Sequence, residues 1–266
     1  MTIITRITRK GKDENQFGAT HRRFAYDTCG MINSMCVIKI LNIFERGITT
    51  MKMIYTGERV IPEIMNSRNG LLMEHIARYE YAAESVRGRV LDLGCGVGYG
   101  AEIILDLTEP NYVSEVVGVD IDENSIQYAK EMYGYLKARF HVADIRSDDL
   151  PEQLGLFDSI ICFEVIEHLK EDLAVIENIF RMLQPEGELI ISTPFGQGKG
   201  KPCACAYHVH QYKEEEFRAL LDPFFHVEMY GQRDTVIERK QEGMKYYLMI
   251  ACCKRKKNAP ATAKGE

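Results

Sequence analysis

The sequence predicts an α/β protein with a doubly wound, mostly parallel sheet that helices cover on both faces. The first observation is a short apolar run, residues 90–93, which opens into a turn with glycine at every second position from 94 to 100. The second is the alternation of further strand-length apolar runs with helical patterns, which is typical of a parallel sheet. The third is that no stretch approaches the roughly 18 uninterrupted apolar residues of a membrane span.

Asp92 is the one charged residue in the first predicted strand. A carboxylate inside a buried strand costs free energy unless it finds hydrogen-bond donors. We therefore expect Asp92 either to reach a ligand or to brace the glycine turn. The glycines remove the side chains that would keep a ligand away from the backbone.

The other predicted elements follow from periodicity and turn residues. Residues 71–86 form an amphipathic helix, ended by Gly88, that can cover the sheet as an N-terminal roof. After the glycine turn we expect helix 101–107, strand 116–120, helix 125–136, strands 140–143 and 157–163, helix 169–183, strand 188–192 after a turn at 185–187, and strands 224–230 and 245–252 as a possible hairpin.

The glycine turn is typical of nucleotide-cofactor sites. A dinucleotide-binding fingerprint can be fitted to Gly96, Gly98 and Ala101, but it is a weak match. The Gly-Lys-Ser/Thr of a phosphate-binding loop is absent, so we expect a ligand without a polyphosphate. What distinguishes this turn is Asp92, which stands two positions before the first glycine.

Asp92, Gly94, Gly96 and Gly98 together resemble the first motif of class I S-adenosylmethionine-dependent methyltransferases. The resemblance implies a Rossmann-like fold with a seven-stranded sheet whose last strand is antiparallel. It would cover residues 55–253, between a poorly patterned N-terminal extension, 1–54, and a disordered tail, 254–266. Residues 55–59 also resemble a segment of bacterial methyltransferases from glycan pathways. One hypothesis is that native translation begins at Met51.

In an open parallel sheet the ligand lies beyond the carboxyl ends of the strands. Asp120 ends the second predicted strand, where it can accept ribose hydroxyls or cap the next helix. The resemblance implies that Asp144 contacts the adenine amino group with Ile145 nearby, although a helix cap or turn is the alternative. Ile121 can offer an apolar face to adenine. The predicted S-adenosylmethionine site comprises Asp92, Gly94, Cys95, Gly96, Gly98, Asp120, Ile121, Asp144, Ile145, Glu164 and Arg78.

Two members of that set belong to the methionine end of the cofactor. Glu164 ends the fourth predicted strand, and the resemblance places it between the methionine part and the substrate. Arg78, on the roof helix, either reaches the methionine carboxylate or is exposed to solvent. Acidic residues at successive strand ends suit a sulfonium cofactor, which is positively charged and has no phosphate.

On the substrate side, Glu164, Glu167 and His168 are spaced so that one turn can direct them to a common point. With His208 they can hold a divalent cation that lowers the pKa of a substrate hydroxyl. This set resembles the ubiquinone-pathway O-methyltransferases and the small-RNA 2′-O-methyltransferases. The alternatives are His168 as a metal-free general base and a structural Glu-His pair. Candidate catalytic residues are His168, Glu167 and His208.

Composition limits the partners and the cellular location that we expect. The 266 residues carry a net charge of -6, and the dense basic run 254–257 is typical of a solvated tail, so we do not expect an extended nucleic-acid surface. Cysteine positions favour reduced thiols and a cytoplasmic location. We expect a flexible loop at 196–201, whose lysines attract an anionic substrate, followed by Cys203-Ala-Cys205 in the same substrate loop.

The predicted function is S-adenosylmethionine-dependent methylation of a small molecule, at a hydroxyl group. Metal-dependent RNA 2′-O-methylation is the alternative within the same reaction class. A nicotinamide oxidoreductase and a cofactor-binding protein without turnover are alternatives from other classes.

Overall fold

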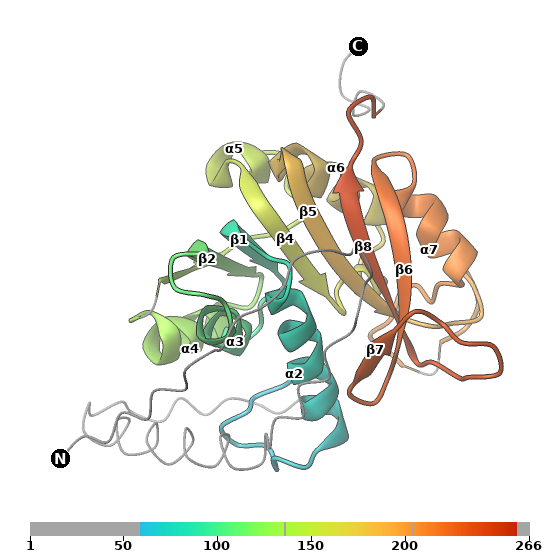
Figure 1. Cartoon of the computed structure of the whole chain (residues 1–266), viewed down its shortest axis with the longest axis horizontal. Helices are drawn as coiled ribbons and strands as arrows, with labels where there is room; N and C mark the ends of the chain where they lie inside the picture. Colours follow the sequence, from blue (N-terminus) through green and yellow to red (C-terminus); the bar gives the residue numbers. More distant parts are fainter. Residues whose placement is uncertain (1–58, 136, 204, 260–266) are drawn as a thin grey trace, which may run out of the picture.

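A computed structural model describes residues 59–135, 137–203 and 205–259, which form one eight-stranded sheet with helices on both faces (Figure 1). The strands are β1 (Gly88–Leu93), β2 (Val113–Asp120), β3 (Ala138–Val142), β4 (Phe157–Phe163), β5 (Leu183–Pro194), β6 (Phe225–Arg233), β7 (Val236–Glu238) and β8 (Leu248–Arg255). The helices are α2 (Gly70–Ala83), α3 (Tyr99–Leu107), α4 (Glu123–Tyr133), α5 (Leu150–Leu154), α6 (Asp172–Met182) and α7 (Glu214–Leu221), with a 3₁₀ turn at Ile166–His168.

The strand order is β3-β2-β1-β4-β5-β8-β6-β7. Strands β1 to β5 pair in parallel, whereas β8 runs antiparallel to both β5 and β6. The chain builds outward from β1 through β2 to β3 and then crosses back to β4 on the other side of β1. The carboxyl ends of β1 and β4 therefore flank the point where a ligand binds in open α/β sheets.

The predicted α/β class is confirmed, but the expected count of seven strands is one too low. The additional strand is β7, which turns back at Asp234 and pairs with the end of β6. Its three residues are too few to give a periodic signal. The two predicted C-terminal strands pair antiparallel as β6 and β8, but β7 and the loop after it separate them, so they do not form a simple hairpin.

Other elements also differ from the prediction. The turn expected at residues 185–187 lies inside β5, where the register against β4 shifts. Helix α7 forms in a region without an assigned pattern. Strand β8 runs to Arg255, so Lys254 and Arg255 belong to the sheet and not to the predicted tail. The N-terminal extension, residues 1–54, lies outside the described residues.

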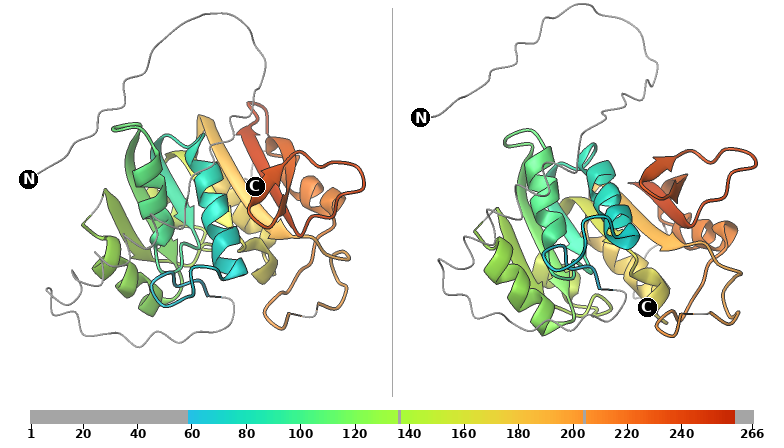
Figure 2. Two further views of the ribbon diagram at one scale, coloured as in Figure 1. Left: turned by 60° about the horizontal axis from the view of Figure 1, so that its bottom comes forward. Right: turned by 90° about the horizontal axis from the view of Figure 1, so that it is seen from below.

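The sheet separates two apolar layers. One contains buried side chains of α2, α3 and α4, among them Leu72, Ile104 and Ile126, and the other contains those of α6 and α7. Figure 2 shows α2 and α3 side by side on their face of the sheet. Because strand side chains alternate, Ile250 of β8 faces the first layer and Met249 faces the second. In the part of the chain that the structure describes, no helix combines the length and apolar character needed to cross a membrane.

Candidate active site

The glycine turn after β1 has free space beside its backbone at one position. Gly94, Gly96 and Gly98 all have positive φ angles, 75°, 53° and 85°, which glycine adopts without a steric penalty. A Cβ atom added at Gly98 would lie 2.7 Å from the Cβ of Ala129, so this glycine allows the turn to pack closely against α4. An added Cβ at Gly96 would meet nothing within 4 Å. The backbone at Gly96 therefore faces space that a ligand can occupy.

Asp120 fixes this open part of the turn from the end of β2. Its Oδ2 accepts a hydrogen bond from Gly96 N at 2.9 Å, and its Oδ1 accepts one from Asp122 N at 2.9 Å. The alternative that Asp120 caps α4 is wrong, because Asp122 is the N-cap and accepts from Ser125 N. Ile121 is 64% exposed beside these groups, so its apolar side chain is accessible to a ligand.

Asp92 is buried and is held by the roof helix. Both of its carboxylate oxygens accept from the Tyr79 hydroxyl, at 3.2 and 3.1 Å. Burial raises the pKa of Asp92 to about 7, while the Tyr79 hydrogen bond acts in the opposite direction. A Cβ at Gly100 would lie 2.2 Å from the Tyr79 ring, so glycine is needed there for α2 to pack over the turn. The sequence prediction missed Tyr79, although it lies on the apolar face of the predicted roof helix.

Arg78, next to Tyr79, is also buried. Its side chain is 1% exposed, so the solvent-exposed alternative is wrong. One guanidinium nitrogen donates to Gln232 Oε1 on β6 at 2.8 Å, and Nε has no hydrogen-bond partner among the described residues. The sequence gave no sign of Gln232, which lies on a distant strand. Arg78 therefore presents a buried positive charge at the carboxyl edge of the sheet.

The carboxylate of Asp144 is paired with a neighbouring arginine. Arg146 forms a two-point contact with its carboxylate, with Nε–Oδ1 and Nη2–Oδ2 distances of 2.9 and 2.7 Å, and this contact lowers the pKa of Asp144. Arg146 N also donates to Oδ1, which makes the local turn that was the alternative for this residue. Ile145 is 8% exposed and packs in the α6 layer. The adenine contacts of Asp144 and Ile145 stay predictions.

Glu164 adopts a strained backbone at the end of β4. Its φ angle of 54° lies in the left-handed region, which costs a non-glycine residue about 1 to 2 kcal/mol. Ser192 of β5 offsets this cost by donating its hydroxyl proton to Glu164 Oε1 at 2.7 Å and accepting from Glu164 N through its carbonyl oxygen at 3.3 Å. The Glu164 side chain is therefore held in one orientation.

Glu167 is held in the same way by the next residue of β5. Thr193 donates its hydroxyl proton to Glu167 Oε2 at 3.1 Å, while Oε1 is buried and has no hydrogen-bond partner within residues 59–135, 137–203 and 205–259. Burial, and then the negative charge of Glu164, raise the pKa of Glu167 well above its ordinary value. Glu167 is 1% exposed, so bulk solvent does not reach its second oxygen, and a buried carboxylate oxygen is costly unless it meets a donor or a cation.

The two carboxylates lie on opposite faces of the sheet. Ser192 is paired with Ile250 in the α2 layer, whereas Thr193 is paired with Met249 in the α6 layer. Strand alternation thus places Glu164 toward the roof helix and Glu167 toward α6. This arrangement separates Glu164 from Glu167, which were both among the four predicted metal ligands.

Glu167 meets two histidines on its side of the sheet. One ligand atom each of Glu167, His168 and His208 lie within 4.8 Å of one another, and among the described residues Glu164 is not part of this group. The rings of His168 and His208 are 4.9 Å apart and nearly perpendicular. His168 Nδ1 lies 3.0 Å from the carbonyl oxygen of Tyr207. The structure therefore brings together the three predicted catalytic residues.

The segment that carries His208 is anchored at several points. The Glu167 carbonyl oxygen accepts from the backbone N–H groups of Val209 and His210, at 2.8 and 2.9 Å. Farther along, the Tyr212 hydroxyl donates to Asp172 Oδ2 at 2.8 Å. These bonds join the segment to the 3₁₀ turn and to the start of α6, so His208 is held beside Glu167 by backbone contacts as well as by its ring.

The loop at residues 196–201 is more constrained than its composition predicts. Lys199 Nζ lies 2.6 Å from Asp172 Oδ2, and Lys199 N donates to Glu216 Oε2 at 3.1 Å. The expectation that both lysines attract an anionic substrate is therefore wrong for Lys199, whose ammonium group is neutralised. Cys203 and Cys205 follow this loop with partly exposed side chains, and neither belongs to the group of candidate metal ligands.

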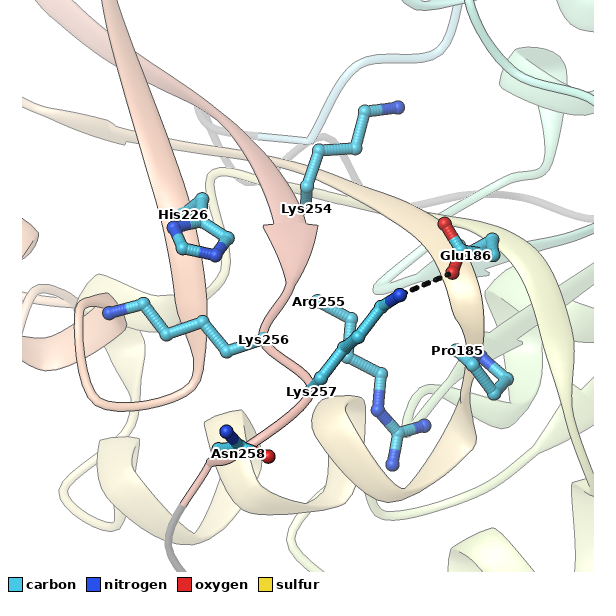
Figure 3. A pocket seen from close by; sticks show the side chains of 9 residues that line it. Pro185, Glu186, His226, Lys254, Arg255, Lys256, Lys257 and Asn258 are labelled. Atoms are coloured by element: carbon cyan, nitrogen blue, oxygen red, sulfur yellow. Dashed lines mark ion pairs between the residues drawn. The ribbon is translucent and has the colours of Figure 1, made fainter.

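A basic groove of about 520 Å³ lies away from these residues (Figure 3). It is lined by the start of β5 and the end of β8, at the amino ends of the parallel strands. Two of its lysines already face carboxylates, with Lys254 at 3.0 Å from Glu188 and Lys257 at 3.9 Å from Glu186. Ligands of open α/β sheets bind at the carboxyl ends, so this groove lies at the edge opposite the candidate active site.

A family model described as a methyltransferase domain matches residues 84–241, which run from the end of the roof helix past β7. The chain belongs to this family. Its place among the class I S-adenosylmethionine-dependent methyltransferases agrees with the strand order and with the glycine turn after β1.

Relatives that match in sequence, and solved structures that match in fold, are also methyltransferases. The chain is 33% identical over 175 residues to a probable S-adenosylmethionine-dependent methyltransferase of Mycolicibacterium smegmatis, covering 63% of each chain. It is 31% identical over 121 residues to a ubiquinone biosynthesis O-methyltransferase of Xanthomonas campestris, covering 44% of this chain and 48% of the relative. The chain thus spans less than two thirds of these relatives. The crystal structure of the small RNA methyltransferase HEN1 superposes with a TM-score of 0.57 at 22% identity, covering 80% of this chain and 27% of that chain.

Proposed function

We propose that this methyltransferase binds S-adenosylmethionine across the carboxyl edge of the sheet and transfers the methyl group to a hydroxyl oxygen of a small molecule. The observation that carries the proposal is the meeting of Glu167, His168 and His208 at the edge where the glycine turn leaves its backbone open. The group of three side chains supports removal of a proton from the acceptor. The open glycine turn supports a cofactor lying within reach of that acceptor.

The adenosine end of the cofactor would lie near Gly96, Asp120 and Ile121. Each Asp120 oxygen accepts one backbone hydrogen bond and has a further lone pair, so the carboxylate can still accept from a ribose hydroxyl. Ile121 offers an exposed apolar surface for the adenine ring. The methionine carboxylate would be bound by Arg78, whose buried charge has a neutral partner.

The acceptor hydroxyl would lose its proton to His168. A carbonyl oxygen can only accept, so the contact between His168 Nδ1 and Tyr207 O places a proton on Nδ1. In the neutral ring this leaves Nε2 with a lone pair, which is the form that a general base requires. The sulfonium methyl group is electrophilic without further activation, so catalysis consists mainly of alignment and proton removal.

A divalent cation at Glu167, His168 and His208 is a second candidate for the acceptor side. The partnerless Glu167 Oε1 favours it, since a buried carboxylate oxygen is stabilised by a cation. When bound, the ion would act as a Lewis acid that lowers the pKa of the acceptor hydroxyl. Of the four predicted ligands, these three are the ones we propose, because Glu164 is held on the other face of β5.

RNA methylation is the less favoured alternative. It would require a basic surface at the site, but the chain carries a net charge of -6. The basic groove in Figure 3 lies at the opposite edge of the sheet. A small-molecule acceptor is therefore the better match to the charges of the described residues.

The test is a transfer assay with methyl-labelled S-adenosylmethionine and panels of hydroxyl, amine and RNA acceptors, each with and without chelator. We expect labelled methyl ethers from hydroxyl acceptors. Activity that persists in chelator assigns proton removal to His168, whereas loss that is restored by added Mg²⁺ or Mn²⁺ assigns the cation. Methylation confined to amines or RNA would contradict the proposal. Cofactor binding without transfer to any acceptor would favour a binding protein.

A further inference from the structure

Among the described residues, no carboxylate forms an ion pair with Arg78, which is a buried cation. Arg78 is 1% exposed, and Gln232 is the one hydrogen-bond partner of its guanidinium group in the part of the chain that the structure describes. Glu74 and Glu167 lie near this charge, but burial raises the pKa of both carboxyl groups and neither forms an ion pair with Arg78. An unpaired buried charge is costly to maintain. The position is therefore suited to an anion that arrives with a ligand.

Gln232 holds Arg78 through a fully used amide group. Its Oε1 accepts from the guanidinium at 2.8 Å, and its Nε2 donates to the carbonyl oxygens of Glu74 and Asp234, at 2.9 and 2.8 Å. Gln232 itself is 1% exposed. These bonds connect α2 with the turn between β6 and β7, two elements that lie side by side in Figure 1. The amide therefore has a fixed orientation, and so does the guanidinium that it contacts.

The neutrality of this amide has a functional consequence. A glutamate at the same position would face Arg78 with a carboxylate and neutralise it. Glutamine positions the guanidinium but leaves its charge available. We propose that Gln232 is a positioning residue that keeps Arg78 ready to bind the carboxylate of the methionine part of the cofactor. This inference rests on the proposed function, because it takes the cofactor to be S-adenosylmethionine.

The proposal is tested by comparing two ligands that differ at the amino-acid end. S-Adenosylhomocysteine carries the carboxylate, and 5′-methylthioadenosine has the same adenosine and thioether sulfur without it. Isothermal titration would measure the affinities of both for the wild-type protein and for Gln232→Glu. We expect S-adenosylhomocysteine to bind the variant about 10- to 100-fold more weakly, as for a lost charged hydrogen bond, and 5′-methylthioadenosine to bind within about two-fold of wild type.

A double-mutant cycle shows whether Gln232 acts through Arg78. Arg78→Met should cause the same selective loss, and adding Gln232→Glu to it should cause little further loss. Gln153→Glu on exposed α5 is the matched control, which adds the same charge and should leave both affinities unchanged. Gln232→Met, which removes the amide without adding a charge, should bind S-adenosylhomocysteine with an affinity between those of wild type and Gln232→Glu. It provides the same comparison if Gln232→Glu does not fold.

Three results would overturn the inference. These are an equal loss for both ligands, no loss for either, and losses that add in the double variant. Each would be seen in a protein whose wild type binds S-adenosylhomocysteine, so the proposed function would stand. A wild-type protein that bound neither ligand would instead remove the proposed function, and this inference with it.

Discussion

Thr193 donates a hydrogen bond to the buried carboxylate of Glu167 at 3.1 Å, at the end of the strand that also brings Ser192 to Glu164. Two consecutive hydroxyl residues thus orient two carboxylates on opposite faces of one sheet. In each pair the hydroxyl holds one carboxylate oxygen, and in the described part of the chain Glu167 Oε1 has no hydrogen-bond partner. The Glu164 carboxylate thus lies on the side of the roof helix, and the Glu167 carboxylate lies on the side of His168 and His208.

Thr193→Val should lower kcat for methyl transfer. Valine has nearly the same shape but no hydroxyl, so Glu167 Oε2 would be left buried without a donor, at a cost of about 1 to 3 kcal/mol in stability. Thr193→Ser keeps the donor and is the control. Urea unfolding measures stability and steady-state kinetics measures kcat. If valine and serine had the same kcat, the orienting role of the hydroxyl would be wrong.

Asp120→Ala should weaken cofactor binding. The substitution removes the acceptor that fixes Gly96 N and, in the proposed complex, the acceptor for the ribose, with an expected loss of about 1 to 3 kcal/mol in binding free energy. Asp122→Ala is the matched control, because it removes the cap of α4 and should cost about 0.5 to 2 kcal/mol of stability with little change in affinity. Titration with S-adenosylhomocysteine compares the two. Equal affinities would exclude Asp120 from the cofactor site.

Asp92 should make the fold less stable as the pH rises from about 4 to 7. Burial raises its folded pKa to about 7, above the ordinary value near 4, so the folded state binds more protons than the unfolded state in this range. The stability is thus present below the unfolded pKa and is lost as the pH rises through the folded pKa. Asp92→Asn should remove this dependence and gain on the order of 1 to 4 kcal/mol relative to wild type between pH 5 and pH 8.

Denaturant unfolding of both proteins at a series of pH values provides this comparison. Asp158→Asn, which changes a carboxylate at the opposite edge of the sheet, serves as the control. A difference between wild type and Asp92→Asn that does not vary with pH would show that Asp92 titrates near its ordinary value.

The sequence predicted those features that depend on local pattern. The apolar strand, the glycine turn and the acidic residue at the end of β2 are close together in the chain, and the fold positions them as expected. The short spacing between Glu167 and His168 likewise predicted a common site, and His208 joins them.

What the sequence could not predict are the partners that the tertiary structure brings in from a distance. Tyr79 reaches Asp92 from another element, and Gln232 is 154 residues from Arg78. Such pairs leave no periodic signal. The division between Glu164 and Glu167 was also hidden, because it depends on which face of β5 each neighbouring hydroxyl occupies. For Asp144 the deciding residue, Arg146, was local, but only the structure shows its side chain folded back onto the carboxylate.

A crystal structure with S-adenosylhomocysteine tests the central claim most directly. We predict that the ligand lies along the carboxyl edge of the sheet, with its ribose at Asp120, its carboxylate at Arg78 and its sulfur facing the group of Glu167, His168 and His208. An empty carboxyl edge in crystals that contain the ligand elsewhere, for example in the basic groove of Figure 3, would contradict the account.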